Sequence, residues 1–402
     1  MALTLAAFFC LASGFLIVLM GSGRLSASGY LFAVSLSAGF GLGVFSVVFY
    51  LGLLLRISHM ILLDLTVFLL LLVGFFWLRT RFATNKAVVE GTENRVRPAW
   101  VHHVLTAGFI VALCAALYAA IMRTLTYPHG DGWDAFSIWN LHARFLFRGG
   151  ANWRDGFTPL VPWSHPDYPL LLPAAVAHFW KYLGRDATAV PAVLGLVFTF
   201  STVGLLYSAL SILRGRLAAL LGATALLATP SFIEQGTSQY ADVPLSFFVL
   251  ASVALLCIYD KRARDSSQAA HSQGPQGLLV LAGLVCAFAG WTKNEGLLFL
   301  CAFVLARAIC LASDRDSGRS WVAHLRPILP LLAVTAPALL LVASFKHFIA
   351  PPGDLFSDPS AMLHKLLIPA RYWAVTKWYF KEFFRFRHLR NCRRCRAGLH
   401  SL

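Results

Sequence analysis

Acidic, basic and aromatic residues gather in one interval of the chain, residues 127–173, which lies between two long apolar stretches. It opens with YPHGDGWDAFSIWNLHARFLF and continues to SHPDYPLLLP. A carboxylate here could act as a general base on a hydroxyl group, and arginine or lysine could neutralise a departing phosphate. Tryptophan and tyrosine rings could stack on a sugar. The interval therefore holds the residue types needed to transfer a group from a phosphate to a hydroxyl.

The first part of this interval predicts an amphipathic helix over Asp134–Arg148. At about 100° per residue, its polar side chains share an arc of about 120°. We expect this helix to lie at a bilayer surface, with aromatic residues down and the polar face toward a cavity. Asp134 would occupy the first turn, where the helix N-terminus stabilises a carboxylate, after a tight turn at Gly130 and Gly132. The polar arc consists of Asp134, Ser137, Asn140, Arg144 and Arg148, and the remainder includes Phe136, Ile138, Trp139 and Phe145.

Arg144 would lie about 15 Å further along this helix, where it could hold another part of the same ligand. The alternative is a capping aspartate followed by solvated arginines. Three other polar groups favour a ligand site: the proline-fixed turn SHPDYP, the carboxylate of QYADVP at the start of an apolar stretch, and the turn WTKNEG. Ionisable groups at membrane depth are costly and therefore candidates for function. For Lys293 the alternative is contact with lipid headgroups, and for Glu295 it is helix capping.

Long apolar stretches must position these groups. Of 402 residues, 58% are hydrophobic and 13% are charged. A membrane-spanning helix needs about 20 apolar residues, and its backbone must be satisfied within the segment. We therefore predict an all-α, multi-pass transmembrane bundle of about 10–11 spans, whose extracytoplasmic loop bears amphipathic juxtamembrane helices. The expected spans are residues 3–20, 30–55, 60–78, 101–122, 188–213, 217–233, 243–259, 277–292, 296–311 and 327–349.

The net charge of +16 comes from basic residues in short clusters between these apolar stretches. This is the pattern of the positive-inside rule and disfavours a nucleic-acid partner. Counting spans places four clusters on one side, which is predicted to be cytoplasmic. Residues 123–187, 234–242 and 293–295 are then extracytoplasmic, so the chemically capable groups converge on one face. The clusters are Arg79, Arg81, Lys86, Arg95 and Arg97; Arg214 and Arg216; Lys261, Arg262 and Arg264; and Arg315, Arg319 and Arg326.

The cysteines and the chain ends predict no further site. Six cysteines stand alone in apolar stretches, as small buried hydrophobes do. Cys392 and Cys395 form a CxxC without a second pair, which supports a zinc site only weakly. The first apolar stretch lacks a basic start, which argues against a cleaved secretory signal. The arginine-rich run after Phe384 has two explanations, a further helix at 361–384 or a truncated or frame-shifted end, and we favour the second.

The order of these motifs resembles that of the glycosyltransferase-C superfamily, specifically the bacterial family-39-like membrane glycosyltransferases related to protein O-mannosyltransferases and lipid A aminoarabinose transferases. GWDAFSIWNLHARFLF resembles the acidic motif of their first large extracytoplasmic loop, and HPDYPLLLP resembles the turn that follows. YADVPL resembles their second acidic position, and TKNEG is similar to a recurrent turn. The resemblance covers residues 120–350. It departs in having Trp-Asp where many members have Asp-Glu, which leaves a requirement for Mg²⁺ or Mn²⁺ open.

The resemblance implies an enzyme that transfers a hexose or pentose from a polyprenyl-phosphate donor to an acceptor hydroxyl, with inversion. The acceptor would be a lipid, a glycan or a protein, at the extracytoplasmic face of a bacterial inner membrane. Asp134 would be the catalytic base, and Asp242 would assist it. No metal ligands are assigned. The substrate-binding candidates are Asp131, Trp133, Arg144, Arg148, His165, Asp167, Tyr168, Tyr240, Lys293 and Glu295.

Three regions are expected: N-terminal transmembrane helices with a basic loop in 1–100, a catalytic membrane module in 101–350 with its loop at 123–187, and a C-terminal segment in 351–402. Two other functions fit the same composition. A transporter or flippase of lipid-linked saccharides would have broken helices near the bilayer midplane and often two similar halves. A non-catalytic subunit of a polymer-assembly complex would need no catalytic base.

Overall fold

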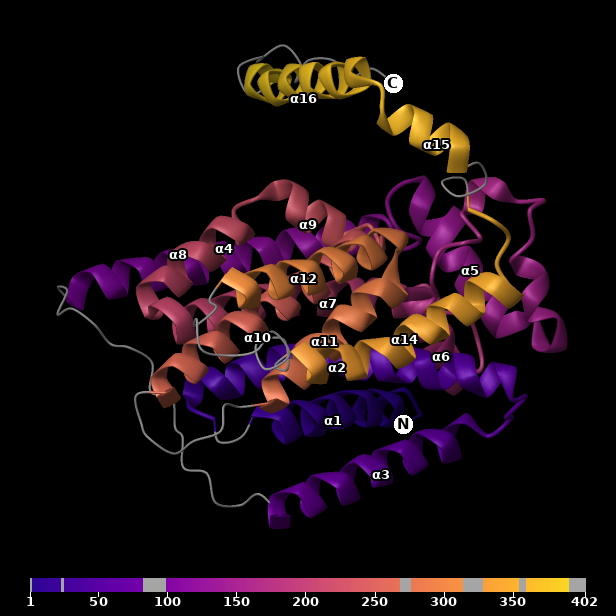
Figure 1. Ribbon diagram of the computed structural model, residues 1–402, viewed down its shortest axis with the longest axis horizontal. Coiled ribbons are helices and arrows are strands. Elements are labelled where there is room, and N and C mark those ends of the chain that lie inside the picture. The colour runs from indigo at the N-terminus through magenta and orange to yellow at the C-terminus, as the bar shows by residue number, and fades with distance from the viewer. Residues whose placement is uncertain are drawn as a thin grey trace. The chain divides into compact units, whose positions relative to one another are not determined.

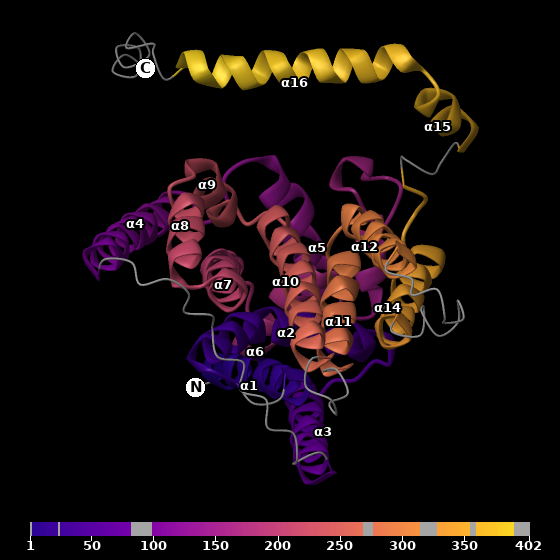
Figure 2. The ribbon, with the colours of Figure 1, turned by 60° about the vertical axis from the view of Figure 1, so that its left-hand side comes forward.

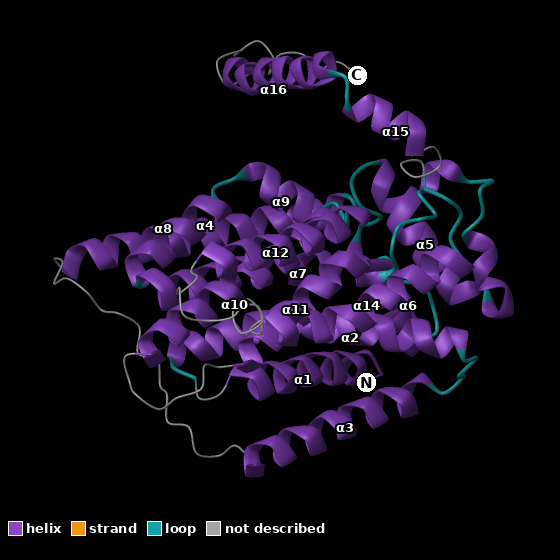
Figure 3. Ribbon diagram, in the orientation of Figure 1, coloured by secondary structure: helices purple, strands orange, loops and turns teal. Residues whose placement is uncertain are grey.

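The computed structural model describes residues 2–22, 25–81, 99–267, 276–313, 328–353 and 359–389. The described residues form helices and connecting turns without a strand, which confirms the all-α prediction (Figure 3). The chain divides into two units, Met1–Pro351 and Pro352–Leu402. The basic residues Lys86, Arg95, Arg97, Arg315, Arg319 and Arg326 and the pair Cys392 and Cys395 lie outside the described residues.

Eight described helices are long and apolar enough to cross a membrane, so the protein is a multi-pass membrane protein. A ninth apolar helix, α11 (Gln276–Thr292), is shorter. Each falls on one of the expected spans. The eight are α1 (Ala2–Ser22), α2 (Ala27–Leu54), α3 (Met60–Arg81), α4 (Ala99–Thr126), α7 (Ala189–Arg214), α10 (Asp242–Ser267), α12 (Asn294–Ser313) and α14 (Leu329–Phe348).

The span expected at 217–233 is not one straight helix. It consists of α8 (Arg216–Leu227) and α9 (Pro230–Thr237), which are bent by 66° relative to each other. Pro230 has no backbone N–H and disfavours helical geometry at the residue before it. Thr229 is accordingly extended, with φ −93° and ψ 102°. The bend carries α9 toward the polar residues that follow it.

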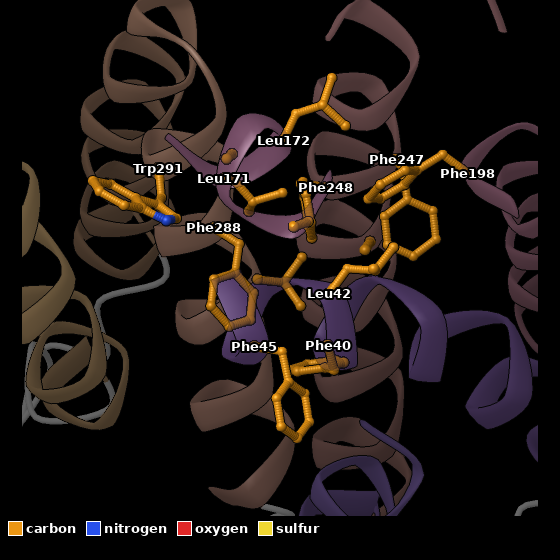
Figure 4. Packing of buried hydrophobic residues seen from close by; sticks show 14 of the residues in the cluster. Phe40, Leu42, Phe45, Leu171, Leu172, Phe198, Phe247, Phe248, Phe288 and Trp291 are labelled. Atoms are coloured by element: carbon orange, nitrogen blue, oxygen red, sulfur yellow. The ribbon is translucent and has the colours of Figure 1, made fainter. Parts of the chain in front are cut away.

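The core of the first unit lies among α2, α7, α10, α11 and the shorter helix α6 (Leu171–Leu183). Figure 4 shows aromatic and leucine side chains from these helices converging around Leu42. Helices α1 and α2 approach closely, because a Cβ at Gly14 would lie 1.9 Å from the Ser37 carbonyl oxygen. Small residues at such crossings are typical of helix packing in membranes.

Helix α3 lies at the periphery of this unit in both views (Figures 1 and 2). Only 6% of its apolar window is buried in the protein. One acidic residue of α3, Asp64, is nevertheless fully buried and contacts two residues of α6. His178 lies 2.7 Å from the Asp64 carboxylate, and the Tyr182 hydroxyl donates to the same oxygen at 2.5 Å. This buried triad joins α3 to the core.

The segment between α4 and α7 contains short helices: η1 (Ala135–Trp139), α5 (Asn140–Arg148), η2 (Gly150–Gly156), η3 (Pro162–Ser164) and α6. The expectation of one regular α-helix over 134–148 is wrong, because η1 is a π-helix. Its wider turn rotates the side chains that follow, so the uniform arc computed at 100° per residue does not hold. Ser137 and Asn140 are buried, whereas Phe136 is exposed. The polar face is therefore not uniformly solvated.

The second unit contains α15 (Pro359–Leu366) and α16 (Pro369–Leu389). These helices cover the interval 361–384, where the first of the two explanations considered for this region expected a further helix. Aromatic side chains of α16, including Trp373, Trp378 and Tyr379, are exposed.

Candidate functional site

Tyr168 is the first of two tyrosines around which the predicted residues assemble. The chain turns just before it, where His165 takes a left-handed conformation with φ 48° and the Tyr168 amide donates to the His165 carbonyl at 3.0 Å. The ring of Tyr168 stacks with those of His165 and Trp139, at centroid distances of 4.9 and 5.6 Å. The Lys293 ammonium lies 5.9 Å from the same ring. Burial, followed by the negative charge of Glu295, raises the pKa of Tyr168.

Lys293 lies in the turn between α11 and α12. Its ammonium is 3.0 Å from Asp242 at the start of α10 and 3.4 Å from Glu295. The Lys293 side chain is mostly buried, but both carboxylates are about half exposed. Burial opposes the lysine's charge, yet its bond to Asp242 and the nearby negative charges outweigh that effect and raise the pKa of Lys293. The Lys293 ammonium is therefore held between two carboxylates, which does not fit the alternative of a side chain that extends toward lipid headgroups.

Tyr240 is the second tyrosine, and it lies against the turn that precedes η1. Gly132 has φ +93°, and a Cβ there would lie 2.3 Å from the Tyr240 hydroxyl, so this close approach requires glycine. Burial raises the pKa of Tyr240, and the charges of Asp134, Asp131 and Asp242 add to the effect. The charges of three carboxylates, from two segments that are distant in sequence, thus act on one hydroxyl.

Asp134 differs from the other carboxylates of this cluster. Its side chain has no ion pair or hydrogen bond with any described residue, and it does not cap η1. Asp131, in contrast, is paired with Arg123 of α4, and Asp242 is paired with Lys293. A carboxylate without a protein partner keeps its oxygen lone pairs for a ligand. The capping role considered for Asp134 is therefore not what the geometry shows.

Asp167 serves to hold the loop against the helices. The Asn294 amide donates to its carboxylate at 2.8 Å, and the Lys346 ammonium donates to its backbone carbonyl at 2.9 Å. The Lys346 ammonium also lies 3.7 Å from its carboxylate. Asp167 is only 9% exposed. These contacts join the turn before Tyr168 to α12 and α14, which fixes that ring beside Lys293.

The predicted residues Arg144 and Arg148 lie elsewhere. Both contact Asp186, which follows α6, with nitrogen–oxygen distances of 3.3 and 2.5 Å. Trp133 is exposed and contacts the rings of Phe136 and Trp163. The structure thus brings together Asp131, Asp134, His165, Asp167, Tyr168, Tyr240, Asp242, Lys293 and Glu295, with Trp133 next to Asp134, but not the two arginines.

Sequence reasoning missed several residues that position this cluster. Arg123 binds Asp131 and lies 3.3 Å from the Thr237 hydroxyl of α9. Gln239 accepts from the Asn140 amide at 2.8 Å and donates to the Pro128 carbonyl at 3.2 Å. Arg123 stands between the apolar stretch and the acidic turn that contains Asp131, and this position could have identified it. Nothing in the sequence distinguishes Gln239.

Among the described residues, no three His, Cys, Asp or Glu side chains are grouped so that they could hold a metal ion.

Residues 172–349 match the family model for dolichyl-phosphate-mannose-protein mannosyltransferase. Neither the curated proteins nor the solved structures include a match to the chain. The matched interval contains Tyr240, Asp242, Lys293 and Glu295, whereas Asp134 and Tyr168 precede it. The resemblance inferred from the sequence motifs is confirmed as a match over residues 172–349: this part of the chain is similar to the dolichyl-phosphate-mannose-protein mannosyltransferases, membrane glycosyltransferases of the glycosyltransferase-C superfamily.

Proposed function

We propose that the protein transfers a sugar from a polyprenyl-phosphate donor to an acceptor hydroxyl, with inversion, at the extracytoplasmic face of a bacterial inner membrane. The observation that carries this proposal is the free carboxylate of Asp134 beside Tyr240 and the Asp242–Lys293 pair. A general base must reach the hydroxyl that it deprotonates. Asp134 is the carboxylate of the cluster that has no ion pair or hydrogen bond with a described residue. It can therefore accept the proton of the acceptor hydroxyl without first breaking an ion pair.

The reaction follows from this arrangement. The acceptor hydroxyl gives its proton to the Asp134 carboxylate while its oxygen attacks the anomeric carbon of the donor sugar. The bond from that carbon to the phosphate oxygen breaks, and its electron pair leaves with the lipid phosphate. Displacement in a single step inverts the configuration at the anomeric carbon. Tyr168 and Tyr240 offer hydroxyl groups and aromatic surface on which the sugar can be oriented.

Lys293 is the cation placed to neutralise the leaving phosphate. Lys293 is shared by the carboxylates of Asp242 and Glu295, so these three side chains together carry a negative charge until one carboxylate is displaced. Glu295 is the partner that a phosphate would replace, because it lies farther from the ammonium, at 3.4 Å against 3.0 Å, and its side chain is 54% exposed. Asp242 would then remain on Lys293 and keep the ammonium oriented.

The test is transfer by the purified full-length protein in lipid nanodiscs, supplied with a panel of radiolabelled polyprenyl-phosphate sugars and with lipid, glycan or peptide acceptors. We expect labelled product from at least one donor, with the anomeric configuration opposite to that of the donor when the product is examined by NMR. A product with retained configuration would contradict direct displacement. Movement of intact donor between leaflets without any product would support the transporter alternative.

A further inference from the structure

Arg144 and Arg148 belong to a second cationic site at the end of α6. They share the single carboxylate of Asp186, and Arg185 lies beside it in the chain. Three guanidinium groups therefore accompany one acid, which leaves a net charge of about +2 here if all four groups are ionised. The Arg148 side chain is 62% exposed, and Arg185 is exposed. An anionic ligand at this position would meet donors that are not fully used by the protein.

An apolar cavity reaches this cationic site at Arg185, which is one of the residues that line it. It has a volume of about 350 Å³ and lies among α1, α2, α6 and α7. Its walls are almost entirely aliphatic and aromatic, and Arg185 is the charged residue among those that line it. Leu11 and Val193 line it and are about half exposed, at 47% and 53%, so the cavity is accessible from the surface that these helices present to the membrane.

Such a combination suits an amphipathic anion with a long apolar chain. A hydrocarbon chain fits the aliphatic walls, and a phosphate at its head can bond to Arg185 and Arg148. Basic pockets between transmembrane helices are a known form of lipid headgroup recognition. Membrane phospholipids are amphipathic molecules of this kind, and they surround every multi-pass protein. We propose that this cavity is a specific site for one anionic glycerophospholipid, with an acyl chain inside and the phosphate on the arginines.

This site is separate from the candidate transfer site. No residue that lines the cavity belongs to the cluster around Tyr168 and Tyr240. The proposal therefore gives Arg148, one of the two predicted ligand-binding arginines, a ligand other than the sugar donor, and it does not depend on the proposed reaction. A lipid seated here would contact α1, α2, α6 and α7 together, and α6 also carries His178 and Tyr182 of the buried triad.

The test uses the full-length protein in phosphatidylcholine vesicles that contain a trace of spin-labelled phosphatidylglycerol or, in parallel, spin-labelled phosphatidylcholine. Electron paramagnetic resonance measures the fraction of each lipid that the protein immobilises. We expect phosphatidylglycerol to be immobilised in preference to phosphatidylcholine. Replacing both arginines, R148Q with R185Q, should lower this preference by about fivefold for each arginine removed. The matched control R154Q removes an exposed arginine that does not line the cavity and should leave the preference unchanged.

A second pair of variants tests the cavity itself. Ala7 lines it, so A7F should fill part of the volume and reduce immobilisation of phosphatidylglycerol. A119F adds the same side chain to an exposed position of α4, away from the cavity, and should have no effect. The proposal is overturned if the wild-type protein shows no preference, or if the double arginine variant and A7F both retain it. Displacement of labelled phosphatidylglycerol by unlabelled polyprenyl phosphate at equal concentration would also overturn it, because the cavity would then belong to the sugar donor.

Discussion

Replacing His178 with phenylalanine should destabilise the protein strongly, although this histidine lies outside the candidate transfer site. The Asp64 carboxylate is fully buried, and the described residues that bond to it are His178 and Tyr182. His178→Phe leaves the carboxylate with the tyrosine hydroxyl alone. Removing one member of a buried polar pair costs about 3–5 kcal/mol, because the other member stays desolvated. Phenylalanine should fit the space, since Phe45 and Phe49 already contact the His178 ring.

The remaining variants of this series separate polar satisfaction from packing. Tyr182→Phe removes one hydroxyl and should cost about 1–3 kcal/mol, less than the loss of the histidine. Changing all three residues, Asp64→Leu with His178→Phe and Tyr182→Phe, leaves no buried polar group of the triad and should restore most of the stability. Thr66→Val alters an exposed residue of α3 whose hydroxyl bonds only within its own helix, and it should change stability little.

The assay is the free energy of unfolding of the purified protein in mixed micelles, measured by titration with sodium dodecyl sulfate. Cysteine accessibility on α3 provides a second readout, since this helix has few other buried contacts. From most to least stable, we expect the order wild type, triple variant, Tyr182→Phe, His178→Phe. If the triple variant were as unstable as His178→Phe, packing around the ring would explain the loss, and the reasoning from buried polar groups would be refuted.

Three further predictions concern charge. Lys293→Ala should raise the KM for the donor while the protein still folds. Glu295→Gln should lower this KM, because the carboxylate that competes with phosphate for Lys293 is gone. Steady-state transfer kinetics check both variants, and equal KM values for them and the wild type would contradict a phosphate-binding role of Lys293. An impermeant thiol reagent applied to intact cells should label a cysteine placed at 155 and spare one at 90, and the reverse pattern would place the transfer site on the cytoplasmic side. His142 of α5 is buried without a hydrogen-bond partner among the described residues, and burial, followed by the charge of His165, lowers its pKa from 6.5 to about 3. As the pH falls, the His142 imidazole takes up a proton in the unfolded chain before it does so in the folded protein. Its neutral form should therefore contribute its full stability above about pH 6.5, and this contribution should fall as the pH drops toward 3. His142→Phe should reduce that fall when thermal melting is followed between pH 7 and 4.

Most of the fold could be predicted because hydrocarbon leaves so few choices for the backbone. Long apolar stretches must be helices, so the spans were located to within a few residues. The errors arose where local chemistry competes with that rule. Pro230 breaks a stretch that hydropathy alone presents as continuous, and the π-helix before α5 changes which side chains face inward. A uniform angle per residue cannot anticipate either feature.

The candidate site was predicted in its membership better than in its internal contacts. Single polar residues in apolar surroundings identified Asp242 and Lys293, but their pairing depends on how α10 and α11 pack. The pairing of Arg144 and Arg148 with Asp186 could not be foreseen, because Asp186 lies 38 residues beyond Arg148 in the chain. Asp64 carried a usable signal that was overlooked, since an acid inside the run MILLDLTVF is costly unless it is paired.

The role of Asp134 as the general base can be tested with a pair of matched variants. Asp134→Asn keeps the shape of the side chain but removes the basic carboxylate, whereas Asp131→Asn makes the same change in the neighbouring acid that is paired with Arg123. Both variants should be assayed as purified protein for sugar transfer at saturating donor. We expect Asp134→Asn to lower the transfer rate by about 10²–10⁴-fold with normal expression, and Asp131→Asn to lower it far less. Near-wild-type transfer by Asp134→Asn would contradict the account, and the base would then have to be sought at Asp242 or Glu295.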